Sequence, residues 1–355
     1  MVALLIGVGV RLYLAVAYEG NFDQVSFEIV AGIVRRGGNV YAETTRYNYT
    51  PVWAILLGAF DGVARLIGQP LHAVVRSTLT LVDVVNALLI GRIALRYAGM
   101  PVSRGFATYL LNPVAILIVG YHGQFETLAA LPLLLAIAAA PARGSASAAW
   151  RWLLGAIALI VKHIVVFQVW VLFWYSFSAR KQPRALLFAV VLFAATFMPY
   201  LDGGVPGIYQ NVFLYGGLAG LYGIGSFLPR PLAMLVFVVV MAAIPVVSRR
   251  AGLSLAAAMC LSGVAFIATV FGIGEQYFLI PIIFGGAFGG RWFWLYTTAA
   301  TLFLLASPNN VGILSLPPLW NLVWIAAVAW LAALIYASAR RSAGAESGGS
   351  HEPLP

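Results

Sequence analysis

Long apolar runs constrain the fold of this chain more than any other feature. A helix needs about 20 mainly apolar residues to cross the hydrocarbon core of a bilayer. Of the 355 residues, 62% are hydrophobic and only 9% are charged, so most of the surface must face lipid. The sequence therefore predicts an all-α, polytopic transmembrane helical bundle. The clear candidate spans are 2–18, 75–96, 104–121, 124–141, 185–200, 231–247, 253–271 and 319–338.

Two further apolar runs carry charge in their middle. Lys162 lies at the centre of 149–178, and Arg291 lies within 277–306. Each run is either one long helix or a hairpin of two short helices. The segment 51–68 is also apolar, but Asp61 interrupts it.

The distribution of lysine and arginine decides between these topologies, because cytoplasmic loops carry the excess of positive charge. If both runs are hairpins and 51–68 inserts only partly into the membrane, most of the lysines and arginines fall on the cytoplasmic side. We therefore expect about 12 crossings, with both termini in the cytoplasm. The prediction places the protein in the cell membrane, with its first long loop on the extracytoplasmic face.

The domain organisation follows from the same pattern. Residues 1–338 form one membrane-embedded domain, and the polar, Gly/Ser-rich segment 339–355 is predicted to be a disordered cytoplasmic tail. The net charge of +10 lies at the ends of apolar runs, where it orients helices, so nucleic acid is not an expected partner.

This topology gathers ionisable side chains on the outer side. The first loop contains a predicted amphipathic helix from Asp23 to Arg36, whose apolar face carries Phe22, Val25, Ile29, Ile33 and Val34. Asp23 at its start is either a helix cap or a carboxylate that acts as a general base or metal ligand. Both interpretations stay open at the level of the residue.

The tight turn His122-Gly-Gln124-Phe-Glu126 joins two spans on the same side. Its polar side chains form either a His–Glu pair that caps a helix or part of a binding site. Lys162 and His163 lie at the outer tip of their predicted hairpin, and a lysine there either snorkels to the headgroups or meets an anion. The adjacent histidine favours a phosphate.

Further signals come later in the chain. Glu275-Gln276-Tyr277 opens an outer span, either as a helix start or as a binding group. The glycine- and tyrosine-rich segment 201–228 has little helix propensity and suggests a mobile cover or a sugar-stacking surface. Asp83 and Asn86 lie inside a span, which indicates interhelical hydrogen bonds.

The chain lacks a P-loop, a GxGxxG after a strand and an HExxH motif. Without a nucleotide-binding domain, neither a nucleotide-sugar donor nor an organic cofactor is expected. A lipid-linked donor fits the architecture, and a divalent cation stays an open question.

The order of several motifs resembles the GT-C superfamily of membrane glycosyltransferases, near the dolichyl-phosphate-glucose glucosyltransferases and the PIG-M-type mannosyltransferases. The motifs are Asn21-Phe-Asp23, Gly38-Asn-Val-Tyr41, Tyr47-Asn-Tyr-Thr-Pro51, Asn112-Pro113, His122-Gly-Gln-Phe-Glu126 and Glu275-Gln-Tyr277. Together they extend over most of the chain.

The resemblance implies an inverting hexosyltransferase that moves mannose or glucose from a polyprenyl phosphate to a hydroxyl of a glycan, glycolipid or protein on the outer face. Asp23 would be the base, with Glu19 as a second candidate. Lys162, His163 or an outer arginine would hold the phosphate. The other expected substrate-binding residues are His122, Gln124, Glu126, Glu275, Gln276, Tyr277, Tyr47 and Tyr49. The alternative is a transporter or flippase of lipid-linked sugars.

Overall fold

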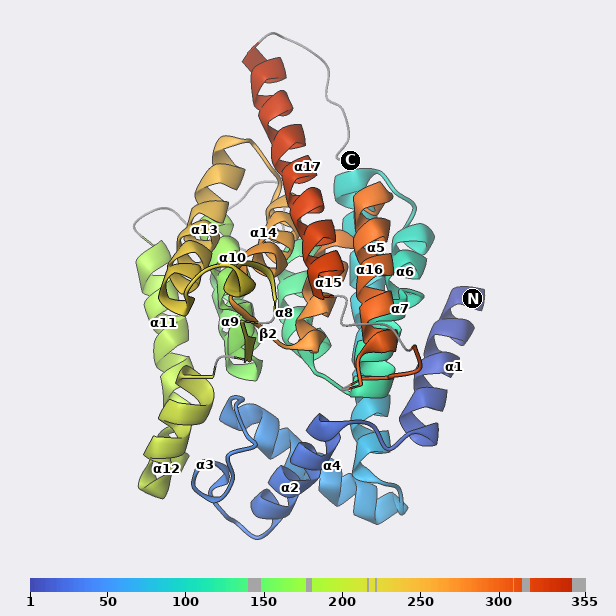
Figure 1. The fold of residues 1–355 in the computed structure, drawn as a ribbon, viewed down its shortest axis with the longest axis vertical. Helices are drawn as coiled ribbons and strands as arrows, with labels where there is room; N and C mark the ends of the chain where they lie inside the picture. The colour runs from blue at the N-terminus through green and yellow to red at the C-terminus, as the bar shows by residue number, and fades with distance from the viewer. Residues whose placement is uncertain are drawn as a thin grey trace.

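A computed structural model describes residues 1–139, 148–176, 181–215, 217–220, 222–308, 310–314 and 320–346. Nearly all of this structure is helical, as the sequence predicts (Figure 1). The one sheet among these residues is a two-residue antiparallel pairing of β1 (Leu218–Ala219) with β2 (Gly272–Ile273).

The main body is a bundle of helices that run up and down the long axis of the molecule (Figure 1). Four helices of the described chain are long and apolar enough to cross a membrane, or up to six when two bent pairs count as one span each. Six of the eight clear predicted spans lie in these helices, whereas 124–141 and 253–271 contain shorter apolar helices, Glu126–Ala138 and Leu255–Thr269. The number of crossings stays a prediction. The bundle consists of α1 (Val2–Ala17), α5 (Leu71–Ala98), α6 (Val102–Leu110), α8 (Glu126–Ala138), α9 (Ala148–Val161), α10 (Val166–Ser176), α11 (Gln182–Ala195), α13 (Arg230–Arg250), α14 (Leu255–Thr269), α15 (Leu279–Gly285), α16 (Gly290–Ala306) and α17 (Trp320–Glu346).

Both ambiguous runs are hairpins. The guanidinium Nη1 of Arg151, near the start of α9, lies 3.5 Å from Ser176 Oγ at the end of α10. Between them, Lys162 has an extended backbone that ends α9. In the second run, the Tyr296 hydroxyl on α16 donates to the Phe278 carbonyl just before α15, at 3.1 Å. Chain reversal therefore occurs at the charged residues in the first run and at the glycines before Arg291 in the second.

The first long loop forms a layer across one end of the bundle, made of α2 (Phe22–Arg35), α3 (Val40–Glu43) and α4 (Pro51–Ile67) (Figure 1). We call this end the loop end. Glycine lets α2 and α4 pack closely, since a Cβ at Gly58 would lie 2.5 Å from Val34 Cγ1. Helix α4 does not satisfy the length and composition of a membrane span.

Helix α2 is amphipathic, but only part of its predicted apolar face is buried. Phe27, Val30 and Ile33 are buried against the layer, whereas Phe22 and Val25 are exposed. Periodicity predicts one apolar face that contains this exposed pair together with the buried Ile33. The difference arises because both faces of α2 carry apolar residues, and only the contact with α4 selects one of them.

A buried polar network joins α1, α5 and α8 inside the bundle. Arg11 Nη2 lies 2.8 Å from Asp83 Oδ2, and both side chains are fully buried. Thr127 Oγ1 donates to Asp83 Oδ1 at 2.7 Å, and Asn86 Nδ2 donates to the Thr127 carbonyl at 2.8 Å. These interhelical bonds match the role expected for Asp83 and Asn86, because a charge among apolar helices must be paired.

Two segments are more helical than the sequence suggests. The start of 201–228 forms α12 (Leu201–Gly207), which is kinked at the non-helical backbone of Asp202 and Gly203, and a π-helical turn, η5 (Ile208–Phe213). Contacts with the loop layer compensate for the weak propensity. Asn39 Nδ2 donates to the carbonyls of Tyr200 and Asp202 at 3.0 and 2.8 Å, and Gly207 packs on the Tyr41 backbone. Helix α17 also continues to Glu346, beyond the predicted boundary at 338, while 347–355 lie outside the described residues.

Candidate active site

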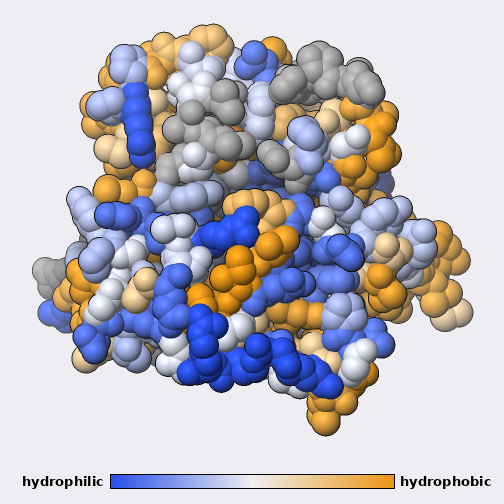
Figure 2. All heavy atoms as spheres, turned by 60° about the horizontal axis from the view of Figure 1, so that its bottom comes forward, coloured by the Kyte–Doolittle hydropathy of each residue, from blue (hydrophilic) through white to orange (hydrophobic). Residues whose placement is uncertain are grey.

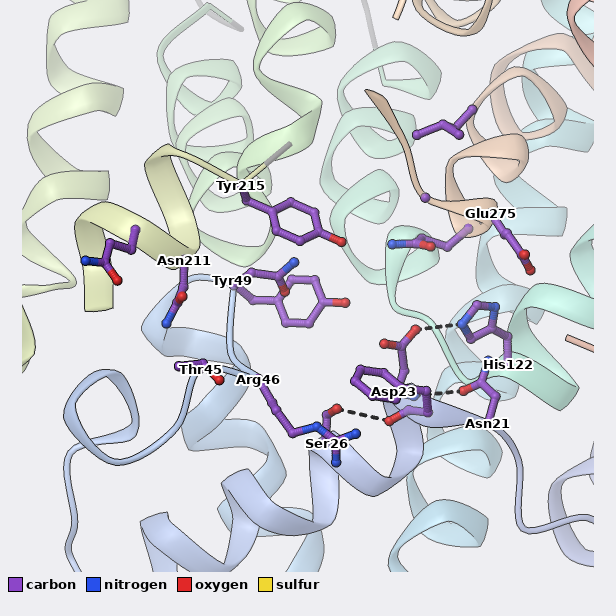
Figure 3. Close-up of a pocket in the computed structure, with 16 residues that line it drawn as sticks. Asn21, Asp23, Ser26, Thr45, Arg46, Tyr49, His122, Asn211, Tyr215 and Glu275 are labelled. Carbon is purple, nitrogen blue, oxygen red and sulfur yellow. Dashed lines mark hydrogen bonds and ion pairs between the residues drawn. The ribbon is translucent and has the colours of Figure 1, made fainter. Parts of the chain in front are cut away.

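A cavity of about 520 Å³ opens at the loop end, where α2 and the following loop face the ends of the bundle helices (Figure 3). Hydrophilic residues gather on this end of the molecule (Figure 2). The lining residues come from four regions of the chain: Asn21, Phe22, Asp23, Ser26, Thr45, Arg46, Asn48 and Tyr49; His122; Gln210, Asn211 and Tyr215; and Ile273, Gly274, Glu275 and Gln276.

Asp23 is held across the fold rather than along its own helix. The cap of α2 is Asn21, whose side-chain oxygen accepts from the Asp23 backbone N–H at 3.1 Å. The carboxylate of Asp23 instead reaches His122 Nε2 and Gln124 Nε2, both 2.7 Å from its Oδ2. No hydrogen bond from the described residues reaches Oδ1. One oxygen is therefore fixed, and the other is available to a ligand.

The surroundings of Asp23 favour its ionised form. Burial on its own raises the pKa of the carboxyl. The hydrogen bonds from His122 and Gln124 and the positive charge of Lys162 outweigh burial and hold the pKa below its ordinary value. Asp23 is thus a carboxylate at neutral pH.

The turn that presents His122 is fixed by its glycine and by α2. Gly123 has a φ of +73°, which a residue with a side chain rarely adopts. Gln24 Nε2 on α2 donates to the His122 carbonyl at 2.7 Å and occupies the space where a Cβ on Gly123 would lie. The turn and the start of α2 therefore position each other.

Lys162 is paired inside the protein instead of facing the cavity. Its Nζ lies 2.6 Å from Glu126 Oε1, with both side chains at most 2% exposed. It also donates to Gln124 Oε1 at 3.1 Å and lies over the Phe125 ring at 4.1 Å. Neither Lys162 nor Glu126 lines the cavity, so the expected phosphate contact of this lysine and substrate contact of this glutamate are absent here. The predicted His122–Glu126 pair does not form either.

Glu275 forms the other carboxylate of the cavity. Ser307 Oγ donates to its Oε1, and Asn310 Nδ2 donates to its Oε2 at 3.3 Å. The same Asn310 nitrogen lies 3.2 Å from His122 Nδ1. Burial raises the pKa of Glu275 above its ordinary value, although these hydrogen bonds act in the opposite direction.

The remaining predicted residues divide between the cavity and the protein interior. Gln276 and Tyr49 line the cavity, whereas Gln124 is fully buried, does not line it, and donates to the Tyr49 hydroxyl at 3.2 Å. Glu19 is exposed on the turn after α1 and does not line the cavity. Arg76 donates to its backbone carbonyl at 3.1 Å. Tyr47 is fully buried and bonds Thr50 and Ala54, which gives it a structural role.

His163 and Tyr277 line a second cavity of about 240 Å³. Aromatic and aliphatic side chains surround most of it, including Phe167, Phe213 and Phe237. Tyr215 lines both cavities, so the two are neighbours. The expected contact of His163 with phosphate is replaced by an apolar environment.

Sequence reasoning expected an outer arginine at the site without saying which one, and it missed other polar groups. Arg46, whose guanidinium lies 3.9 Å from the Phe22 ring centroid, is the one cavity-lining side chain of the described chain that is always charged positive. Asn310 follows α16 on the side that the topology assigns to the outside, and this placement was the available signal. Asn211 and Gln210 lie in the segment interpreted as a cover.

Within the described part of the chain, no group of three His, Cys, Asp or Glu residues has the arrangement of a metal site. No family model, curated protein or solved structure matches the chain. The function is therefore argued from the geometry of the cavity.

Proposed function

We propose that this protein is an integral membrane hexosyltransferase that moves mannose or glucose from a polyprenyl phosphate to an acceptor hydroxyl, with inversion. In this proposal the bundle crosses the membrane about 12 times and both termini are cytoplasmic. The loop end, with its cavity, faces the extracytoplasmic side. Acceptors are glycans, glycolipids or proteins that reach this face.

The observation that carries the proposal is the hydrogen bonding of the two carboxylate oxygens of Asp23. Its Oδ2 is fixed by two donors, and its Oδ1 is unbonded in a cavity of small-molecule size. A carboxylate held in this way is oriented to accept a proton from a hydroxyl group. The neutral amides of the cavity, such as Asn48 and Asn211, suit the hydroxyls of an uncharged sugar.

The neighbouring apolar cavity supports a lipid-linked donor. A polyprenyl chain is a hydrocarbon, and the aromatic lining around Phe167 and Phe237 removes such a chain from water. The shared residue Tyr215 places this lining beside the polar cavity. Arg46 is the outer arginine that supplies positive charge for the phosphate.

The proposed reaction is a single displacement. The acceptor hydroxyl gives its proton to Asp23 Oδ1 while its oxygen attacks the anomeric carbon. The bond from that carbon to the phosphate oxygen breaks, and the phosphate leaves with the electron pair beside Arg46. Because the lowered pKa makes Asp23 a weak base, proton transfer is expected to accompany bond formation rather than precede it.

The test is transfer by the purified full-length protein in proteoliposomes. A panel of polyprenyl-phosphate sugars, radiolabelled in the hexose, is offered with short glycan and glycolipid acceptors. We expect labelled acceptor from a mannose or glucose donor. A transporter of lipid-linked sugars would carry the intact donor across the bilayer without forming product, and that result would reject the proposal.

A further inference from the structure

The side-chain amide of Asn310 lies between Glu275 and His122, and the proposed reaction does not explain its orientation. The nitrogen of Asn310 faces both neighbours, 3.3 Å from Glu275 Oε2 and 3.2 Å from His122 Nδ1. An amide nitrogen carries two hydrogens and no accessible lone pair, so it donates in both directions.

The proton position on His122 follows from this arrangement. A ring nitrogen that accepts a hydrogen bond carries no proton, so Nδ1 of His122 is the unprotonated nitrogen. The proton of the neutral ring is then on Nε2, which lies 2.7 Å from Asp23 Oδ2 and donates to it. The tautomer that Asp23 needs is thus the one that Asn310 selects.

Glu275 fixes which end of the Asn310 amide faces the histidine. A 180° turn of the amide would bring Asn310 Oδ1 against the carboxylate oxygen of Glu275, and two acceptors repel at that distance. Glu275 is itself anchored by Ser307 and is only 4% exposed. The amide oxygen of Asn310 is buried without a hydrogen-bond partner in the described structure, as expected when the orientation is set by its nitrogen.

We propose that Glu275 and Asn310 are positioning residues that hold His122 as the neutral Nε2–H tautomer, so that its proton stabilises Asp23 through Oδ2 and leaves Oδ1 as the proton acceptor. This inference adds to the proposed function and depends on it for its catalytic meaning. The tautomer itself is a property of the protein without substrate.

The experiment is solid-state NMR of the full-length protein in proteoliposomes, with ¹⁵N- and ¹³C-labelled histidine. The chain has four histidines, and a His122→Gln variant identifies the signals of His122. In the unsubstituted protein at neutral pH, we expect a protonated Nε2 and an unprotonated Nδ1. A protonated Nδ1 would overturn the proposal.

Two substitutions test how the tautomer is set. In Asn310→Asp, the new carboxylate accepts a hydrogen bond, so Nδ1 of His122 should gain a proton. In Glu275→Gln, the Asn310 amide is free to turn and present its oxygen to His122, so Nδ1 should gain a proton in part of the population while Nε2 keeps its hydrogen bond to Asp23. Asn48→Asp is the matched control, because it adds the same charge to the cavity lining without a contact to His122. An unchanged His122 spectrum in the first variant rejects the role of Asn310, and in the second it rejects the role of Glu275.

The transfer assay connects the tautomer to catalysis. Asn310→Asp should lower kcat by roughly 10-fold or more while KM for the donor changes little, since general acid–base catalysis and not binding is impaired. Failure of the unsubstituted protein to transfer sugar would reject the proposed function and leave the NMR result valid. An altered tautomer with undiminished kcat would reject the positioning role.

Discussion

At the residue scale, the partners of Asp23 separate two roles that its position in the sequence leaves open. Asn21 already caps α2, so the carboxylate is not needed for the helix. Its partners His122 and Gln124 lie about a hundred residues further along the chain, and both donate to the same oxygen. An asparagine at position 23 would accept the same two bonds through its amide oxygen but would not take a proton.

Asp23→Asn should therefore lower the transfer rate by roughly 100-fold or more, with little change in Tm. Glu28→Gln is the matched control, since it neutralises an exposed carboxylate on the same helix outside the cavity. Rate and Tm are measured on the same preparations. A near-normal rate for Asp23→Asn would remove the catalytic assignment.

The buried pair Lys162 and Glu126 gives a second prediction at this scale. Lys162→Met leaves the Glu126 carboxylate buried without a partner, which should destabilise the protein by about 3–5 kcal/mol. Combining Lys162→Met with Glu126→Gln removes both charges and should restore most of that stability. Thermal and denaturant unfolding in detergent measure this difference.

A lysine that bound the donor phosphate would behave differently. The double variant would then regain stability but lose affinity for the donor. We expect KM for the donor to stay close to that of the unsubstituted protein once folding is restored, because Lys162 does not line the cavity.

At the element scale, α5 defines the two sides of the molecule. Its 28 residues are about 42 Å long, enough to cross a hydrocarbon core of about 30 Å. Helix α4 precedes it and lies in the layer at the loop end (Figure 1). The ion pairs of Asp61 with Arg35 and Arg65 also keep polar groups on α4, as suits a helix at the membrane surface.

Cysteine labelling tests this placement. Gln69→Cys, on the exposed connection between α4 and α5, should react with a membrane-impermeant thiol reagent added outside intact cells. Ser103→Cys, exposed beyond the other end of α5, should stay unlabelled. Cys260 is buried and gives a low background. The reverse labelling pattern would place the cavity on the cytoplasmic face.

At the scale of the whole molecule, the site depends on segments brought together from across the chain. Glu275 receives hydrogen bonds from Ser307 and Asn310, and Asn310 in turn contacts His122. This assembly holds a carboxyl group whose pKa is raised by burial. A raised pKa in the folded state means that the ionised group lowers stability, and this penalty develops as pH rises through the folded pKa.

Glu275→Gln should consequently raise Tm at neutral pH, because it removes the burial cost of the charge. The difference from the unsubstituted protein should shrink as pH falls and Glu275 becomes protonated. Asp23 acts in the opposite direction, since its lowered pKa contributes stability that is lost at lower pH. Tm measured over a pH series for both proteins tests this, and a difference independent of pH would contradict it.

The sequence by itself determined the helical, apolar character of the chain, because composition and run length decide whether backbone and side chains suit a bilayer. It favoured hairpins in 149–178 and 277–306 through the count of positive charges on each side, but one long helix in each run stayed open until the structure showed the reversals. It located Asp23, His122, Gln124 and Glu275, because polar residues at helix ends in so apolar a chain stand out.

Only the tertiary structure decided what those residues contact. Glu126 and Lys162 carry the same charges as other candidates, yet they neutralise each other in the interior, whereas Arg46 lies at the cavity. Periodicity could not choose between the two apolar faces of α2, and propensity could not foresee the helical start of 201–228. Each of these outcomes depends on contacts between residues far apart in the chain, and local sequence does not encode which of several equally polar or apolar partners comes within reach.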